Sequence, residues 1–114
     1  MVMSMSEDVL SRLASVVRQK RDDSTGQSYT RQLLDQGVEK CARKFGEESL
    51  EAVIAALSGS EVALKEEAAD VLYHLLVLLE CRGVAWADVL AILERRTGTS
   101  GLAEKAARNP GGPR

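Results

Sequence analysis

The strongest constraint on the fold of this chain is a short break, Ser58-Gly59-Ser60, between two long segments of helical character. Residues 38–56 precede the break and residues 61–82 follow it, and both repeat apolar residues at helical spacing without an internal proline. Two long helices joined by so short a turn lie antiparallel. We therefore predict a helical hairpin, and we expect residues 68–79, which are apolar on nearly every side, to be its most buried part.

Shorter segments elsewhere in the chain also have the pattern of amphipathic helices. They are residues 6–21, a segment that begins after Ser28 or Thr30 and runs through Gln36, and residues 86–96. Either hydroxyl residue is suited to cap the second segment, because its oxygen can accept a free N–H group of the first turn. Gly37 is suited to end that segment. The sequence shows no strand-like alternation of any length.

The length of 114 residues corresponds to one domain. We expect an all-α fold, an antiparallel bundle of about four to five helices that covers residues 1–108, followed by a disordered tail at residues 109–114. A domain of this size buries a modest core, so we also expect a second copy of the chain to complete the bundle.

Charge and targeting signals narrow the class of protein. The formal net charge of -2 argues against a general binder of nucleic acids or of membrane surfaces. The longest apolar stretch, Leu75–Leu79, is far too short to span a membrane, and the N-terminus lacks the apolar segment of a secretory signal. Cys41 and Cys81 stand outside any CxxC or Cys/His cluster, so we expect reduced cysteines and no zinc site. These features predict a cytoplasmic protein.

Two pairs of carboxylates stand at matched places on the two sides of the break. Glu48 and Glu51 lie three residues apart before it, and Glu67 and Asp70 lie three residues apart after it. Residues at this spacing project from one face of a helix. Glu51 and Glu67 are equally distant from Gly59 along the chain, and so are Glu48 and Asp70. In an antiparallel hairpin the four carboxylates therefore face one another, roughly 12–17 Å from the turn at a rise of ~1.5 Å per residue.

Four carboxylates in one place repel one another, which raises their pKa values or destabilises the site unless a cation balances the charge. Oxygen ligands favour a hard ion, so we expect Mg²⁺, with Mn²⁺ as a substitute. Asp70 is the most informative member, because an aspartate here interrupts an otherwise apolar helical run. The alternative is a carboxylate paired only with a neighbouring base or with His74, which on its own is more typical of a core histidine.

Each charged residue beside these carboxylate pairs has a functional interpretation and a structural one. Glu47 is suited to orient or deprotonate an attacking water, or it is simple surface charge. Lys40 and Lys44 share its helix face, where they either receive phosphate oxygens or form salt bridges such as Lys44–Glu48. Phosphate-cradling loops and nucleophile motifs are absent from the sequence, which leaves metal-assisted attack by water as the expected chemistry.

The acidic pattern, Glu47-Glu48-x-x-Glu51 and then Glu67-x-x-Asp70, resembles the signature of the MazG-like all-α nucleotide pyrophosphohydrolases. Further segments follow in order along residues 28–108. They are Ser28-Tyr29-Thr30 with Leu33, Leu34 and Gly37; Lys40 and Lys44 through Glu48; Glu66 through His74; Leu93 through Arg96; and Ser100, Gly101 and Glu104 through Arg108. Together these segments resemble the phosphoribosyl-ATP pyrophosphohydrolase family of histidine biosynthesis.

The resemblance implies a Mg²⁺-dependent enzyme that hydrolyses phosphoribosyl-ATP to phosphoribosyl-AMP and pyrophosphate, the second step of that pathway, as a homodimer or larger homo-oligomer. It implies that Glu47 orients the water and that the metal ligands are Glu48, Glu51, Glu67 and Asp70. It also implies contacts to the phosphates and ribose of the substrate from a wider set: Ser28, Tyr29, Thr30, Lys40, Lys44, Arg95, Arg96 and Lys105. For the two arginines, ordinary helix-end charge is the alternative.

Two other functions stay open at this point. One is another MazG-like hydrolase that acts on a (deoxy)nucleoside triphosphate, and the other, less favoured, is a non-enzymatic helical interaction module. The loop before Ser28, residues 22–27, departs from the family because a proline-rich approach is more usual there. The conformation of this substrate-side loop is therefore open.

Overall fold

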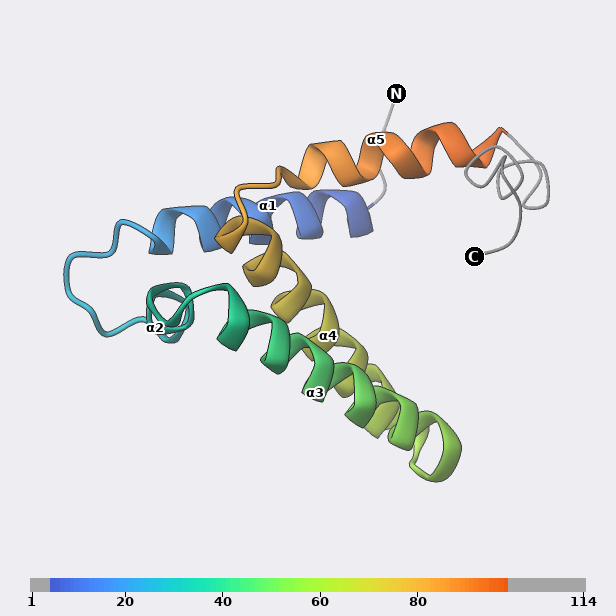
Figure 1. Ribbon diagram of the computed structural model, residues 1–114. Helices are drawn as coiled ribbons and strands as arrows, with labels where there is room; N and C mark the ends of the chain where they lie inside the picture. Colours follow the sequence, from blue (N-terminus) through green and yellow to red (C-terminus); the bar gives the residue numbers. More distant parts are fainter. Residues whose placement is uncertain (1–4, 99–114) are drawn as a thin grey trace, which may run out of the picture. The chain divides into compact units, whose positions relative to one another are not determined.

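Within residues 5–98, which the computed structural model describes, the chain is entirely α-helical (Figure 1). The helices are α1 (Met5–Lys20), α2 (Tyr29–Gln36), α3 (Val38–Ser58), α4 (Glu61–Cys81) and α5 (Trp86–Thr97). The predicted all-α class is confirmed, and each predicted helix is found with ends that differ by at most two residues. The chain divides into one compact unit that carries α1 to α4 and ends at Val84, and a second unit that begins at Ala85 and carries α5.

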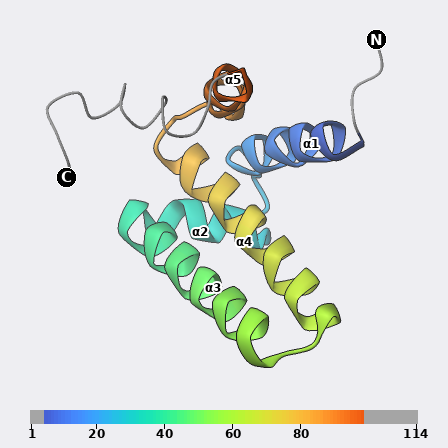
Figure 2. The same cartoon turned by 90° about the vertical axis from the view of Figure 1, so that its right-hand side faces the viewer.

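The predicted hairpin is formed by α3 and α4, which lie side by side and antiparallel (Figures 1 and 2). Ser60 caps α4, since its side-chain oxygen accepts a hydrogen bond from the N–H of Ala63 at 3.1 Å. Gly59 lies so close to the preceding turn of α3 that a Cβ there would come within 2.9 Å of the Ala55 carbonyl oxygen. The break identified in the sequence is therefore a tight turn that requires glycine.

The two ends of α2 are set by two capping residues. Ser28 caps α2, because its hydroxyl oxygen accepts a hydrogen bond from the N–H of Arg31 at 3.2 Å. Thr30, the other capping candidate, lies inside α2 instead. Gly37 separates α2 from α3 with a φ of 92°, a conformation that glycine adopts without strain. The prediction that Gly37 ends the short helix is confirmed.

The core of the first unit lies where α1, α2 and α3 meet α4. Its buried apolar side chains come from all four helices: Val17, Leu33, Cys41, Ala55, Leu76 and Val77. Arg21, which directly follows α1, adds an ion pair to α4, with its Nε 2.9 Å from a carboxylate oxygen of Glu80. None of the described helices is long and apolar enough to cross a membrane.

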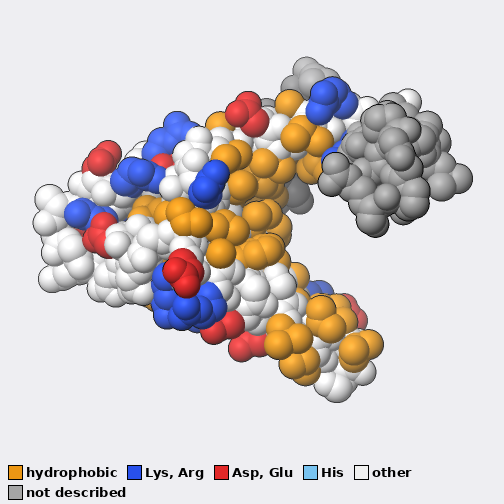
Figure 3. Space-filling view, in the orientation of Figure 1, with side chains coloured by type: hydrophobic (Ala, Val, Ile, Leu, Met, Phe, Trp, Pro, Cys, Tyr) orange, Lys and Arg blue, Asp and Glu red, His pale blue; other side chains and the backbone are white. Residues whose placement is uncertain are grey.

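The prediction that residues 68–79 form the most buried part of the hairpin is correct for only part of that segment. His74, Leu76 and Val77 are buried, whereas Ala68 and Ala69 are exposed and Leu72 keeps 39% of its surface. The ion pairs, hydrogen bond and ring contact that join α4 to Arg18, Arg21 and α2 fall at residues 73–80, away from the turn end of the hairpin. Figure 3 shows hydrophobic side chains gathered at this turn end of the hairpin.

Candidate functional site

The hairpin brings the carboxylates of its two helices together, as the spacing predicts. Glu48 on α3 and Glu67 and Asp70 on α4 each offer an oxygen atom, and these three atoms lie within 4.8 Å of one another. Glu51 lies beside them, within hydrogen-bonding reach of Glu48 and of Glu67. We call these four residues the acidic cluster.

The electrostatics of the acidic cluster reflect this crowding. The pKa of Glu48 is raised, first by burial and then by the charges of Glu51 and Asp70, while Lys44 acts in the opposite direction. The pKa of Glu67 is raised by burial, by its hydrogen bond with Glu51 and by the charges of the other members. Glu48 and Glu67 are therefore harder to ionise, and a bound cation would relieve this cost.

The donor set of the acidic cluster fits a hard divalent ion. All of its ligand atoms are carboxylate oxygens, the type that Mg²⁺ and Mn²⁺ prefer. The Oε2 atom of Glu67 is buried and has no hydrogen-bond partner among the described residues. A buried polar atom without a partner is costly, and coordination to a cation would satisfy it.

Glu47 and Lys44 stand at the edge of the acidic cluster. The Lys44 ammonium lies 3.4 Å from a carboxylate oxygen of Glu47 and 4.0 Å from one of Glu48. The salt bridges weighed in the sequence are therefore present, and a role in receiving phosphate oxygens stays a prediction. Lys40 is half-buried one turn earlier on α3, and Glu47 remains largely open to solvent.

Tyr29, a predicted substrate contact, lies in a group of aromatic rings whose other members, Tyr73 and His74, were not predicted as part of the site. The Tyr29 ring stacks on Tyr73 with 6.5 Å between centroids and meets the edge of His74 at 6.4 Å. Tyr73 and His74 also meet edge to face at 4.9 Å. The pKa of His74 is lowered, first by burial and then by the charge of Lys44, which favours the neutral imidazole. Tyr73 stands in the segment from Glu66 through His74 that resembles the family, but nothing in the sequence indicated a ring contact with Tyr29.

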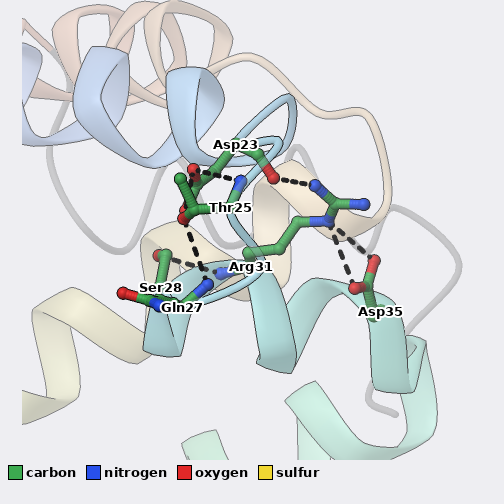
Figure 4. A network of polar contacts seen from close by, with 6 residues as sticks. All are labelled: Asp23, Thr25, Gln27, Ser28, Arg31 and Asp35. Atoms are coloured by element: carbon green, nitrogen blue, oxygen red, sulfur yellow. Dashed lines mark hydrogen bonds and ion pairs between the residues drawn. The ribbon is translucent and has the colours of Figure 1, made fainter.

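The loop before α2 is held by its own hydrogen bonds (Figure 4). The Asp23 carboxylate accepts from the N–H and hydroxyl of Thr25 at 3.1 and 2.8 Å, and these bonds lower its pKa. The Thr25 hydroxyl accepts from the N–H of Gln27 at 3.2 Å. Arg31 donates to the carbonyl oxygen of Asp23 and pairs with Asp35 at 3.2 Å. Polar contacts thus hold the loop before α2.

The remaining predicted substrate contacts are distributed as follows. Ser28 uses its hydroxyl oxygen in the α2 cap, and the Thr30 hydroxyl pairs with that of Tyr73. Arg95 and Arg96 occupy the last turn of α5, in the second unit. Lys105, like the predicted tail, lies outside the described residues. Their roles toward a substrate stay predictions.

Comparison with known proteins identifies relatives over most of the chain. Residues 10–97 match the family described as phosphoribosyl-ATP pyrophosphohydrolase. A phosphoribosyl-ATP pyrophosphatase of Cereibacter sphaeroides is 55% identical over 100 residues, which cover 88% of this chain and 97% of the relative. A protein of the same name from Dinoroseobacter shibae is 54% identical over 88% of this chain and 98% of the relative. Another, from Methylobacterium radiotolerans, is 51% identical over 93% of this chain and 99% of the relative. The chain, with its two-helix acidic cluster, therefore belongs to the phosphoribosyl-ATP pyrophosphohydrolase family.

Proposed function

We propose that this chain hydrolyses phosphoribosyl-ATP to phosphoribosyl-AMP and pyrophosphate, the second step of histidine biosynthesis. The observation that carries the proposal is the acidic cluster, with three carboxylate oxygens from two helices within 4.8 Å, in a member of this family. The names of relatives that are more than half identical to the chain support the substrate. A cytoplasmic location is part of the same proposal.

The acidic cluster is proposed to hold Mg²⁺, or Mn²⁺ in its place, through Glu48, Glu51, Glu67 and Asp70. When bound, such an ion supplies charge neutralisation on the phosphates and a lowered pKa for a coordinated water. Glu47, adjacent to the cluster and largely open to solvent, is proposed to orient the attacking water. Lys44 can exchange its ion pairs for a phosphate oxygen without leaving the edge of the cluster.

A polyanionic substrate requires clustered bases in a chain whose formal net charge is -2. Lys40 and Lys44 supply two such bases on α3. The proposed phosphate and ribose contacts further include Ser28, Tyr29, Thr30, Arg95, Arg96 and Lys105.

We also propose that the enzyme is a homodimer or larger homo-oligomer of this chain. An exposed apolar stripe runs along α3 at helical spacing, formed by Leu50, Val53, Ile54 and Leu57, each with more than half of its surface open. Val62 and Leu72 add exposed apolar surface on α4. Contiguous apolar surface of this kind is typical of a subunit interface, and a second copy would cover the turn end of the hairpin.

The direct test is pyrophosphate release with Mg²⁺ from phosphoribosyl-ATP, offered beside ATP and dCTP at equal concentration. We expect the first substrate to be preferred and turnover to stop when EDTA removes the metal. Preference for dCTP or ATP would favour the second candidate, a nucleoside triphosphate pyrophosphohydrolase of the same superfamily. If none of the three substrates is hydrolysed, and the protein shows no Mg²⁺ binding that is lost in Asp70→Asn or Glu51→Gln, an interaction module is favoured.

A further inference from the structure

Tyr29 presents an aromatic ring to solvent at the first position of α2. It keeps 52% of its surface exposed, although large apolar rings are usually covered. One side of the ring is supported by Tyr73 and His74, both on α4. A ring that has aromatic neighbours and keeps half of its surface open is suited to stack against a planar ligand.

The position of this ring is fixed by a hydrogen bond beneath it. The hydroxyl of Thr30, which is 9% exposed, lies 2.5 Å from the hydroxyl of Tyr73, and either can donate. This bond joins the first turn of α2 to the middle of α4. Ser28 caps the same turn, so the backbone on both sides of Tyr29 is held.

The ring also stands next to the acidic cluster. His74, which it touches, lies one helical turn after Asp70 on α4. Lys44, which pairs with Glu47 and Glu48, is close enough to Tyr29 for the two groups to interact electrostatically. A ligand whose phosphates lie at the cluster and at Lys44 would therefore place its neighbouring planar group near the open side of the ring.

We propose that Tyr29 is the stacking platform for the purine base of the substrate, and that Tyr73 is a positioning residue that holds this platform through Thr30. The proposal rests on the proposed function for the identity of the nucleotide and assigns the base to one side of the acidic cluster. It differs from a contact of the Tyr29 hydroxyl with phosphate or ribose, because here the ring, not the hydroxyl, recognises the ligand.

Two probes that differ in the nucleoside test this assignment without turnover. α,β-Methylene-ATP carries the base and cannot be cleaved between its first two phosphates, whereas tripolyphosphate lacks the base. Both are titrated calorimetrically into the intact protein with Mg²⁺, and the ratio of their dissociation constants measures what the nucleoside contributes. We expect the wild-type protein to bind the nucleotide more tightly, and Tyr29→Ala to reduce that advantage about fivefold to a hundredfold, the range of one base–aromatic stack.

The variants of the supporting pair test the positioning role. Tyr73→Phe and Thr30→Val each remove the hydrogen bond, and we expect each to reduce the nucleotide advantage about threefold to tenfold. The double variant should lose no more than either single one, and Thr30→Ser and Tyr29→Phe should stay within about twofold of wild type. The affinity for tripolyphosphate should fall less than the affinity for the nucleotide in each of these variants, whereas a general loss of structure would lower both alike.

Several outcomes would overturn the proposal. They are a wild-type protein that binds both probes equally, a Tyr29→Ala variant that keeps the full nucleotide advantage, and a Tyr29→Phe variant that loses affinity for both probes. Additive losses in Tyr73→Phe and Thr30→Val would remove the positioning role. Because these readouts are binding constants, they are separate from the hydrolysis assay, whose failure would reject the proposed function instead.

Discussion

The two ends of the α3–α4 hairpin are built from similar residues but meet different surroundings. At the packed end, residues 38–45 and 73–81, the helices are covered by α1 and α2 and contribute the buried Cys41, Leu76 and Val77. At the turn end, residues 50–64, only Ala55 is buried, and Leu57 keeps 83% of its surface exposed. The packed end provides a core within the chain, and the turn end leaves apolar side chains exposed.

The acidic cluster lies between these two ends. A site at this boundary is dry enough to raise the pKa values of Glu48 and Glu67 and still open enough at Asp70 to admit a ligand. Stability and catalysis are therefore expected to respond to different stretches of the same two helices. Four predictions test this division.

The largest effect is expected at the boundary itself. Glu67→Gln keeps the size of the side chain but removes a charge from the proposed metal site, so turnover of phosphoribosyl-ATP should fall by at least about a hundredfold. Glu66→Gln is the matched control, because it makes the same change one residue earlier at an exposed position. Pyrophosphate release at saturating Mg²⁺ measures both. If the two variants lose activity equally, the boundary has no special chemical role.

The next effect compares two valines. Val77 lies at the packed end with 0% of its surface exposed, so Val77→Ala should lower the unfolding free energy by about 2 kcal/mol. The same change at Val62, which is 65% exposed at the turn end, should lower the unfolding free energy by less than about 0.5 kcal/mol when the chain is not associated with a second copy. Urea unfolding gives both values, and it is measured in chains that also carry Ile54→Lys, a substitution expected to weaken self-association. Equal costs would mean that the two ends are packed alike.

The third effect concerns the apolar stripe on α3. Ile54→Lys places a charge in its middle and should weaken self-association at least about tenfold, close to 1.4 kcal/mol. Val16→Lys changes an exposed valine of α1 and should leave assembly as it is. Light scattering during gel filtration over a concentration series distinguishes them. A wild-type chain that is monomeric at every concentration would contradict the proposed interface.

The smallest effect is a pH dependence of the metal-free protein. The pKa of Glu67 is raised above its ordinary 4.5 in the folded state, so the folded chain binds that proton more tightly than the unfolded chain. The resulting stabilisation is present below about pH 4.5 and is lost as the pH rises through the raised value. Glu67→Gln should therefore raise the melting temperature near neutral pH and leave it almost unchanged in mild acid. Calorimetry in EDTA that shows the same shift at both pH values would contradict the crowding of charges.

The hairpin and its acidic cluster could be predicted from the sequence because both follow from local rules. Gly59 marks the turn, helical spacing assigns the faces, and counting outward from the turn pairs the carboxylates. The hydrogen bond between Thr30 and Tyr73 could not be predicted, because it joins residues 43 positions apart whose approach depends on how α2 packs. The exposure of Ala68 and Ala69 was missed for a related reason, since an apolar run does not reveal which of its sides a partner covers.

The close approach at Gly59 has a consequence for how this chain tolerates change. If Gly59 stays packed against α3, one residue inserted after it and taken into α4 would rotate the rest of α4 by about 100° relative to α3, because each residue of an α-helix advances by that angle. Glu67 and Asp70 would then point away from Glu48, although each helix could still form and find apolar neighbours. Insertions in this loop are therefore expected to inactivate the protein well before they unfold it, which makes the length of an exposed, chemically inert loop as important to the chemistry as the carboxylates themselves.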